Sequence, residues 1–174
     1  MTRVCLVGSE DVTLQYELLS RETSREALAT YDLYEPFENA VGVETVSLGA
    51  AVALLNDLDW YLTRFVDEAM VLEPSVSDDE WLSRALATAV RDDDLGPEES
   101  GRYLKIYGVV DPVDGGDEQN PDEPADDAGS DRAEPPRLVE PMYVTRTGGA
   151  LPTYDLREVA ETVVERVTED EFGA

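Results

Sequence analysis

Three stretches of the chain place apolar residues at the spacing of a helix. The longest covers 51–65, where the apolar positions form one face of a helix of roughly four to five turns. A second, over 81–90, follows Ser77-Asp-Asp-Glu80, the spacing of a capping box, and predicts a helix that begins at Trp81. A third follows Asp155-Leu-Arg-Glu158 and predicts a final helix up to Val167, although its valines weaken helix propensity.

Residues 12–32 also have helical spacing, with Leu14 and Leu18 on one face. Thr23 and Glu26 match another capping box. Either one interrupted helix or a strand followed by a helix would fill this segment, and the pattern favours a helix over 23–32.

Runs of β-branched and other apolar residues predict strands between these helices, at 3–7, 41–46, 69–72, 103–110 and 138–147. Pro141 indicates that the first half of the last run lies at a sheet edge or a bulge. The resulting order, β-α-β-α-β-α-β-insert-β-α, predicts an α+β fold with a single sheet and helices packed on it. The pattern leaves open whether the sheet is ferredoxin-like or related, or partly parallel.

Residues 111–136 differ from the rest of the chain. They contain ten acidic residues against Arg132 alone, a net charge of -9, and five of the ten prolines. Such a segment buries too little apolar surface to offset its ordering entropy, so we predict a disordered acidic insert. Residues 1–110 and 137–174 would then form one α+β domain. The insert is either a solvated hairpin loop or an acidic tether for a partner.

Charge adds a prediction about the environment. The chain has 40 acidic and 13 basic residues, no His, and a formal net charge of -27. So many negative charges repel one another in ordinary buffer. At molar salt, where the Debye length falls to about 3 Å, this repulsion is largely screened, so we expect a halophilic protein in a salt-rich cytoplasm. The composition argues against nucleic-acid binding, which usually requires a basic patch.

Other residue counts narrow the function classes. Cys5, the single cysteine, lies in an apolar run and predicts a buried strand thiol, with no disulfide and no cysteine-based metal site. A thiol nucleophile would have no His partner. No apolar run reaches the roughly 18 residues of a membrane span, and we expect no signal peptide, because only four apolar residues follow Arg3. We therefore expect a cytoplasmic protein with no cofactor, and an enzyme is less expected than a binding module.

The candidate site is a local excess of positive charge beside the predicted insert. Arginine and lysine there, followed by a turn with a hydroxyl and free backbone N–H groups, suit an anionic ligand. The alternative is that these side chains pair with neighbouring carboxylates. The predicted anion-site residues are Arg102, Lys105, Arg137, Arg146, Thr147, Gly148 and Gly149.

Two resemblances extend this interpretation. In its acidic composition and in phrases such as Arg-Val-Cys-Leu-Val-Gly-Ser (3–9) and Tyr-Glu-Leu-Leu-Ser-Arg-Glu-Thr (16–23), the chain resembles an uncharacterised family of small haloarchaeal proteins. Residues 54–90, with Val71-Leu72-Glu73-Pro74 between two predicted helices, are similar to the C-terminal part of WYL-type regulators. The second resemblance implies a regulatory or assembly module.

The leading functional hypothesis is a non-enzymatic intracellular interaction or regulatory module with an unidentified protein partner. The alternative is a small-molecule sensor, or an enzyme, that binds an anionic ligand at the 145–149 turn. The sequence leaves the oligomeric state open.

Overall fold

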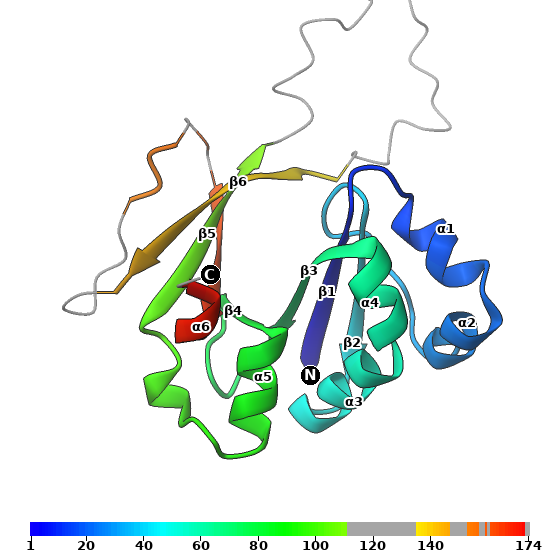
Figure 1. Ribbon diagram of the computed structural model, residues 1–174, viewed down its shortest axis with the longest axis horizontal. Helices are drawn as coiled ribbons and strands as arrows, with labels where there is room; N and C mark the ends of the chain where they lie inside the picture. The colour runs from blue at the N-terminus through cyan, green and yellow to red at the C-terminus, as the bar shows by residue number, and fades with distance from the viewer. Residues whose placement is uncertain (111–134, 147–152, 157–158, 160, 173–174) are drawn as a thin grey trace, which may run out of the picture.

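In the computed structural model, seven strands form one mixed sheet and helices α1 to α5 gather on one of its faces (Figure 1). The structure describes residues 1–110, 135–146, 153–156, 159 and 161–172. The strand order is β2-β1-β3-β4-β7-β5-β6, and all neighbours are antiparallel except β4 and β7. The predicted α+β class is confirmed, and the sheet is of the partly parallel kind.

The strands are β1 (Thr2–Gly8), β2 (Ala40–Thr45), β3 (Val66–Leu72), β4 (Glu80–Ser83), β5 (Tyr103–Val110), β6 (Arg137–Thr145) and β7 (Glu161–Val167). The helices are α1 (Leu14–Leu19), α2 (Glu22–Leu28), α3 (Leu48–Asp57), α4 (Asp59–Phe65), α5 (Arg84–Arg91), α6 (Glu169–Phe172) and the short 3-10 helix η1 (Pro97–Glu99).

The main hydrophobic core lies between the helices and the face of β1 that carries Val4 and Leu6. The stretch 51–65 forms two helices rather than the predicted one, because the backbone leaves helical geometry at Leu58 (φ -95°, ψ 5°). Leu58 itself is fully buried and keeps its place in the apolar repeat. The hydrophobic spacing therefore continues through the break and gives no sign of it.

Residues 12–32 form an interrupted helix, α1 and α2, one of the two predicted alternatives. The second part begins two residues earlier than expected, with Arg21 rather than Thr23 at the N-cap. The hydroxyl of Ser24 donates to the carbonyl oxygens of Leu18 and Arg21, which holds the junction together.

The predicted helix start at Trp81 is wrong. Ser77 Oγ accepts a hydrogen bond from Glu80 N at 3.0 Å, as a capping box requires, but Glu80 begins strand β4. The helix starts only at Arg84, where Ser83 Oγ accepts from Leu86 N at 3.2 Å. The Glu80 side chain bonds to Arg146, just after β6, and to Arg166 of β7 instead of reaching back to its own cap, so a tertiary contact overrides the local pattern.

The predicted final helix is also wrong, because residues 161–167 form strand β7. This segment pairs with β4 on one side and with β5 on the other. Its β-branched residues, Thr162, Val163, Val164 and Val167, favour an extended backbone once two strands are available to pair with it.

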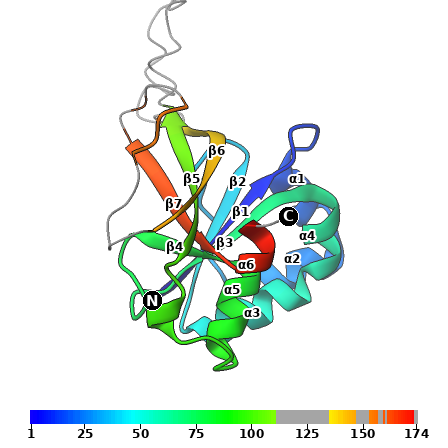
Figure 2. The ribbon, with the colours of Figure 1, turned by 60° about the vertical axis from the view of Figure 1, so that its left-hand side comes forward.

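The sheet is strongly bent, so that β6 crosses from the β5 side toward β1 and β2 (Figures 1 and 2). Glu38 N, just before β2, donates to Pro136 O at 2.8 Å and links the two ends of the sheet. As Pro141 predicts, β6 is an edge strand with a bulge, since its register shifts between the pairs Ile106–Met142 and Gly108–Val139. We call the concave side, away from α1 to α5, the inner face.

Cys5 of β1 lies on the inner face and is fully buried, which confirms the predicted strand thiol. Burial, reinforced by the charges of Glu165 and Glu68, raises the pKa of this thiol to about 12. The thiol is therefore un-ionised at neutral pH and unsuited to nucleophilic chemistry.

In the part of the chain that the structure describes, no helix has the length and apolar content needed to cross a membrane. The predicted insert, 111–136, falls almost entirely on 111–134, outside the described residues. The domain division built on that insert stays a prediction.

Candidate functional site

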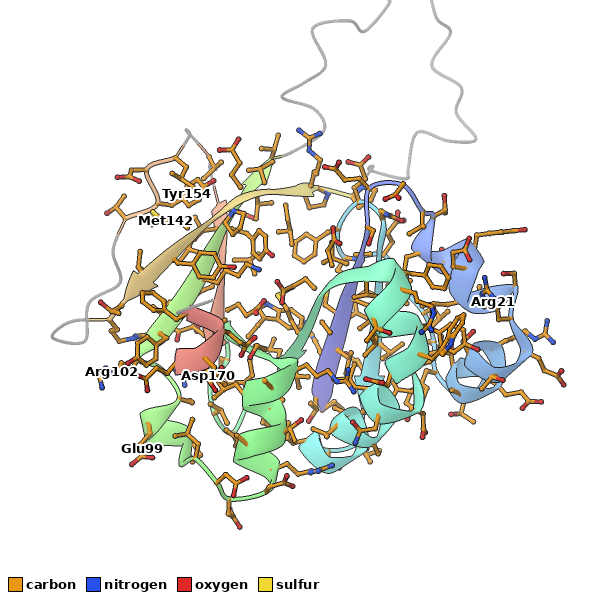
Figure 3. The ribbon with its side chains drawn as sticks, in the orientation of Figure 1. Arg21, Glu99, Arg102, Met142, Tyr154 and Asp170 are labelled. Carbon is orange, nitrogen blue, oxygen red and sulfur yellow. The ribbon has the colours of Figure 1, made fainter. Side chains whose placement is uncertain are left out.

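A cleft of about 1180 Å³ lies where β5 begins and where β6 and β7 end, beside η1 and α6. Arg102, Arg146 and Arg166 all line it. Figure 3 shows Arg102, Glu99 and Asp170 at this corner of the molecule. Apolar residues, among them Leu95 and Pro97, also line the cleft. We call these residues together the arginine cleft.

Strand register explains why three arginines distant in sequence meet here. Tyr103 of β5 pairs with Thr145 of β6 and with Val167 of β7. The residues next to these pairs therefore come to one end of the sheet, and Arg146 N donates to Arg102 O at 2.9 Å.

Glu80 joins two of the arginines. Its Oε1 accepts from Arg146 Nη2 at 2.5 Å and from Arg166 Nε at 2.8 Å. Only about a tenth of the Glu80 side chain is exposed. Burial acts to raise the pKa of this carboxyl, but the hydrogen bonds and charges of the two arginines outweigh it and hold the pKa below its ordinary value.

Further hydrogen bonds fix the two guanidinium groups in place. Arg146 Nε donates to Gly101 O at 3.0 Å, and Arg166 Nη1 donates to Ser100 Oγ at 2.9 Å. Because the N–H groups of an arginine form a rigid fork, these bonds also set the direction of the donors that remain.

Arg102 behaves differently, because it is exposed and its guanidinium lies over its neighbour Tyr103, 5.3 Å from the ring centroid. Within the described ranges it forms no ion pair. Arg146, Arg166 and Glu80 sum to one positive charge, and Arg102 adds another. The exposed carboxylates of Glu99, Glu169 and Asp170 line the same cleft. The site is therefore cationic where the arginines converge and acidic around its border.

The structure brings together two of the predicted anion-site residues, Arg102 and Arg146. Lys105 lies on the inner face, where its Nζ is 2.6 Å from Glu68 Oε2, so the carboxylate-pairing alternative applies to it. Arg137 is exposed at the other end of β6, opposite Val110. Thr147, Gly148 and Gly149 lie outside the described residues.

Sequence reasoning missed Arg166 and Glu80. Arg166 fell in the segment predicted as a helix, where no pattern connects it with Arg102. Glu80 was interpreted as a helix cap. The run of β-branched residues from Thr162 to Val164 was the available signal for a strand in this segment.

The inner face carries a second polar cluster. Glu68 Oε2 of β3 accepts from Lys105 Nζ at 2.6 Å and from Tyr107 Oη at 2.8 Å. Burial acts to lower the pKa of Lys105, but the charge and hydrogen bond of Glu68 raise it above its ordinary value. Burial, then the charge of Glu68, raises the pKa of Tyr107. Across the described residues, no group of three or more His, Cys, Asp or Glu side chains is placed to hold a metal ion.

Residues 2–109, more than half of the chain, match a family of unknown function (DUF5804). No curated protein and no solved structure matches the chain. The prediction of an uncharacterised family is confirmed. The haloarchaeal source and the likeness of residues 54–90 to WYL-type regulators stay predictions.

Proposed function

We propose that this chain, which belongs to the DUF5804 family of unknown function, is a non-enzymatic binding module whose arginine cleft takes an anionic group of a ligand. The convergence of Arg102, Arg146 and Arg166 carries the proposal, because only 13 basic residues face 40 acidic ones in the whole chain. This favours the anionic-ligand alternative of the sequence analysis over a purely protein-docking role.

Preorganisation supports binding at this position. Arg146 and Arg166 are already held by Glu80 and by backbone and hydroxyl groups, so little side-chain entropy remains to be lost when a ligand arrives. Arg102 is exposed and can turn from the Tyr103 ring toward a bound group. Guanidinium groups bind carboxylates and phosphates through paired hydrogen bonds, which makes these groups the expected ligands.

The acidic residues that line the arginine cleft restrict the kind of ligand that it would bind. Glu99, Glu169 and Asp170 repel a ligand that carries only negative charge. A ligand with a cationic group next to its anionic one is attracted by both parts of the cleft. Such a pair is found on a small zwitterion, such as an amino acid, and on a partner protein that presents mixed charges.

The test is a charge reversal of Arg102, because Arg146 and Arg166 also hold Glu80 and belong to the fold. Thermal unfolding in molar KCl would be followed with an α-amino acid, which carries both charges, and with inorganic phosphate and a dicarboxylate, which carry only negative charge. A probe at 100 times its dissociation constant adds about 2.7 kcal/mol to the free energy of unfolding. We expect Arg102→Glu to lose this stabilisation and the matched variant Arg25→Glu, at an exposed position of α2, to keep it.

A parallel capture experiment from a lysate in molar KCl separates the two sources of the anionic group. A partner retained by wild type and by Arg25→Glu but lost with Arg102→Glu would place the group on a protein. The proposal is wrong if no probe stabilises the wild type and Arg102→Glu captures the same proteins.

A salt-rich cytoplasm is part of the same proposal and has its own prediction. At a net charge of -27, lowering KCl from molar to about 0.01 M lengthens the Debye length from about 3 to about 30 Å and exposes the carboxylates to one another. We expect the chain to unfold in low KCl and to refold when salt is restored, as measured by far-UV circular dichroism. NaCl should substitute for KCl, since screening depends on ionic strength. Stability that does not depend on KCl would argue against a halophilic protein.

A further inference from the structure

Glu165 is the most deeply buried charged side chain among those the structure describes. It lies on β7, between Trp81 of β4 and Lys105 of β5 in the strand register, and is 1% exposed. Its Oε2 has no hydrogen-bond partner among the described residues. A buried carboxylate oxygen without a donor costs several kcal/mol, so the ionised form is strongly disfavoured at this position.

Lys105 pairs with Glu165 in the strand register, and its Nζ is 2.6 Å from Glu68 Oε2, so the Glu68 carboxylate lies beside Glu165. Both donors of the cluster, Lys105 Nζ and Tyr107 Oη, point to Glu68 Oε2. The negative charge therefore belongs on Glu68. A second charge beside it at a buried site is strongly disfavoured, and Glu165, which is buried and has an oxygen without a donor, is the group that keeps a proton.

We propose that Glu165 is a proton-binding site, whose proton lies beside the Glu68 carboxylate and whose ionisation loosens helix α6. This inference does not rest on the anionic ligand, since Glu165, Glu68 and Lys105 do not line the arginine cleft, although Glu169 and Asp170 of α6 do. The groups that face Glu165 come from every neighbouring element: Glu68 on β3, Lys105 and Tyr107 on β5, Cys5 on β1 and Glu171 on α6.

Electrostatics agree with this geometry. Burial first, and the charge and hydrogen bond of Glu68 next, raise the pKa of Glu165 well above that of an exposed glutamate. Lys105 opposes this effect, and Glu171 adds to it. For an acid whose folded-state pKa is raised, the stabilising contribution is complete below the unfolded pKa and is lost as pH rises through the folded pKa.

The link to α6 runs through Glu171. Its Oε1 accepts from Ser83 Oγ at 2.5 Å and from Thr168 N at 3.0 Å, so this side chain fastens the start of α6 to β4. A charge on Glu165 would repel Glu171 directly. The Phe172 ring, 5.1 Å from the Tyr103 ring and 6.5 Å from the Tyr143 ring, would then hold α6 against β5 and β6.

Infrared spectroscopy tests the proton itself. Wild-type protein should show the carbonyl stretch of a protonated, buried carboxyl at a pH where exposed glutamates are ionised. Glu165→Gln should remove this band and keep the fold, because the amide has the same shape and no charge. Glu161→Gln, at an exposed position of the same strand, should keep the band. Absence of the band in wild type, or its persistence in Glu165→Gln, would overturn the proposal.

A titration toward higher pH tests whether ionisation of Glu165 destabilises the fold and loosens α6. Between the unfolded and folded pKa of Glu165, the unfolding constant of wild type should rise by up to tenfold per pH unit, and Glu165→Gln should lack this rise. Amide hydrogen exchange at 169–172, corrected for its intrinsic pH dependence, should speed up as the infrared band disappears. Unchanged protection of α6 across that transition would disprove the link to this helix.

Discussion

Glu80→Gln is expected to lower the free energy of unfolding by about 3 kcal/mol, since it removes the one charge that two partly buried arginines share. Both Arg146 and Arg166 bond to the same oxygen, Glu80 Oε1, and their side chains are largely buried. The amide keeps the shape of the carboxylate but leaves two positive charges facing each other.

The pH dependence of this variant gives a second readout. Because the folded-state pKa of Glu80 is lowered, its contribution is present above the ordinary glutamate pKa and is lost as pH falls through the folded pKa. Urea unfolding of wild type in molar KCl should show this acid loss, and Glu80→Gln should not.

Asp78→Asn is the matched control, because it makes the same charge change at an exposed neighbouring position and should cost under about 0.5 kcal/mol. A cost for Glu80→Gln as small as that of the control would mean that the arginines are held without the carboxylate. The arginine cleft would then be less preorganised than its hydrogen bonds suggest.

Asn39→Ala has the other large expected effect, a loss of about 3 to 4 kcal/mol. Asn39 Oδ1 accepts from Leu14 N at 2.9 Å, and its Nδ2 donates to Ser9 O at 3.0 Å and to Val12 O at 2.9 Å. These three bonds hold the turn from β1 into α1, at a net value of about 1 kcal/mol each. The residue also has φ 56°, a left-handed conformation that costs alanine roughly 1 kcal/mol.

Asn39→Gly separates the two contributions. Glycine adopts the left-handed backbone without strain but supplies none of the hydrogen bonds, so Asn39→Gly should be more stable than Asn39→Ala by about 1 kcal/mol. Chemical denaturation of the three proteins provides the measurement. Equal stability of the two variants would show that the backbone conformation carries no cost here, and near-wild-type stability of both would show that the turn is held by other contacts.

Local sequence patterns sufficed where neighbouring residues alone decide the structure. The run 103–110 became β5 at the predicted bounds, Cys5 is buried as its apolar neighbours indicate, and Pro141 lies at a bulge of an edge strand. In each case the cause is short-range: side-chain branching, hydrophobicity or the missing N–H of proline.

The same patterns failed where a distant partner decided the outcome. Residues 161–167 have a spacing compatible with a helix, yet they lie between β4 and β5, whose free edges supply hydrogen bonds along both sides. Ser77 caps Glu80 N as predicted, but the Glu80 carboxyl bonds to two arginines far along the chain.

By itself the sequence determined the α+β class, the core strand of Cys5 and the extreme negative charge, because composition and short-range spacing are sufficient for these properties. Only the tertiary structure decided which charges meet. Strand register brought Arg166 to Arg102 and Arg146, moved Lys105 to the opposite face of β5, and placed Glu165 beside Glu68. Pairing between strands joins residues of any sequence separation, and a one-residue shift in register sends a side chain to the other face of the sheet.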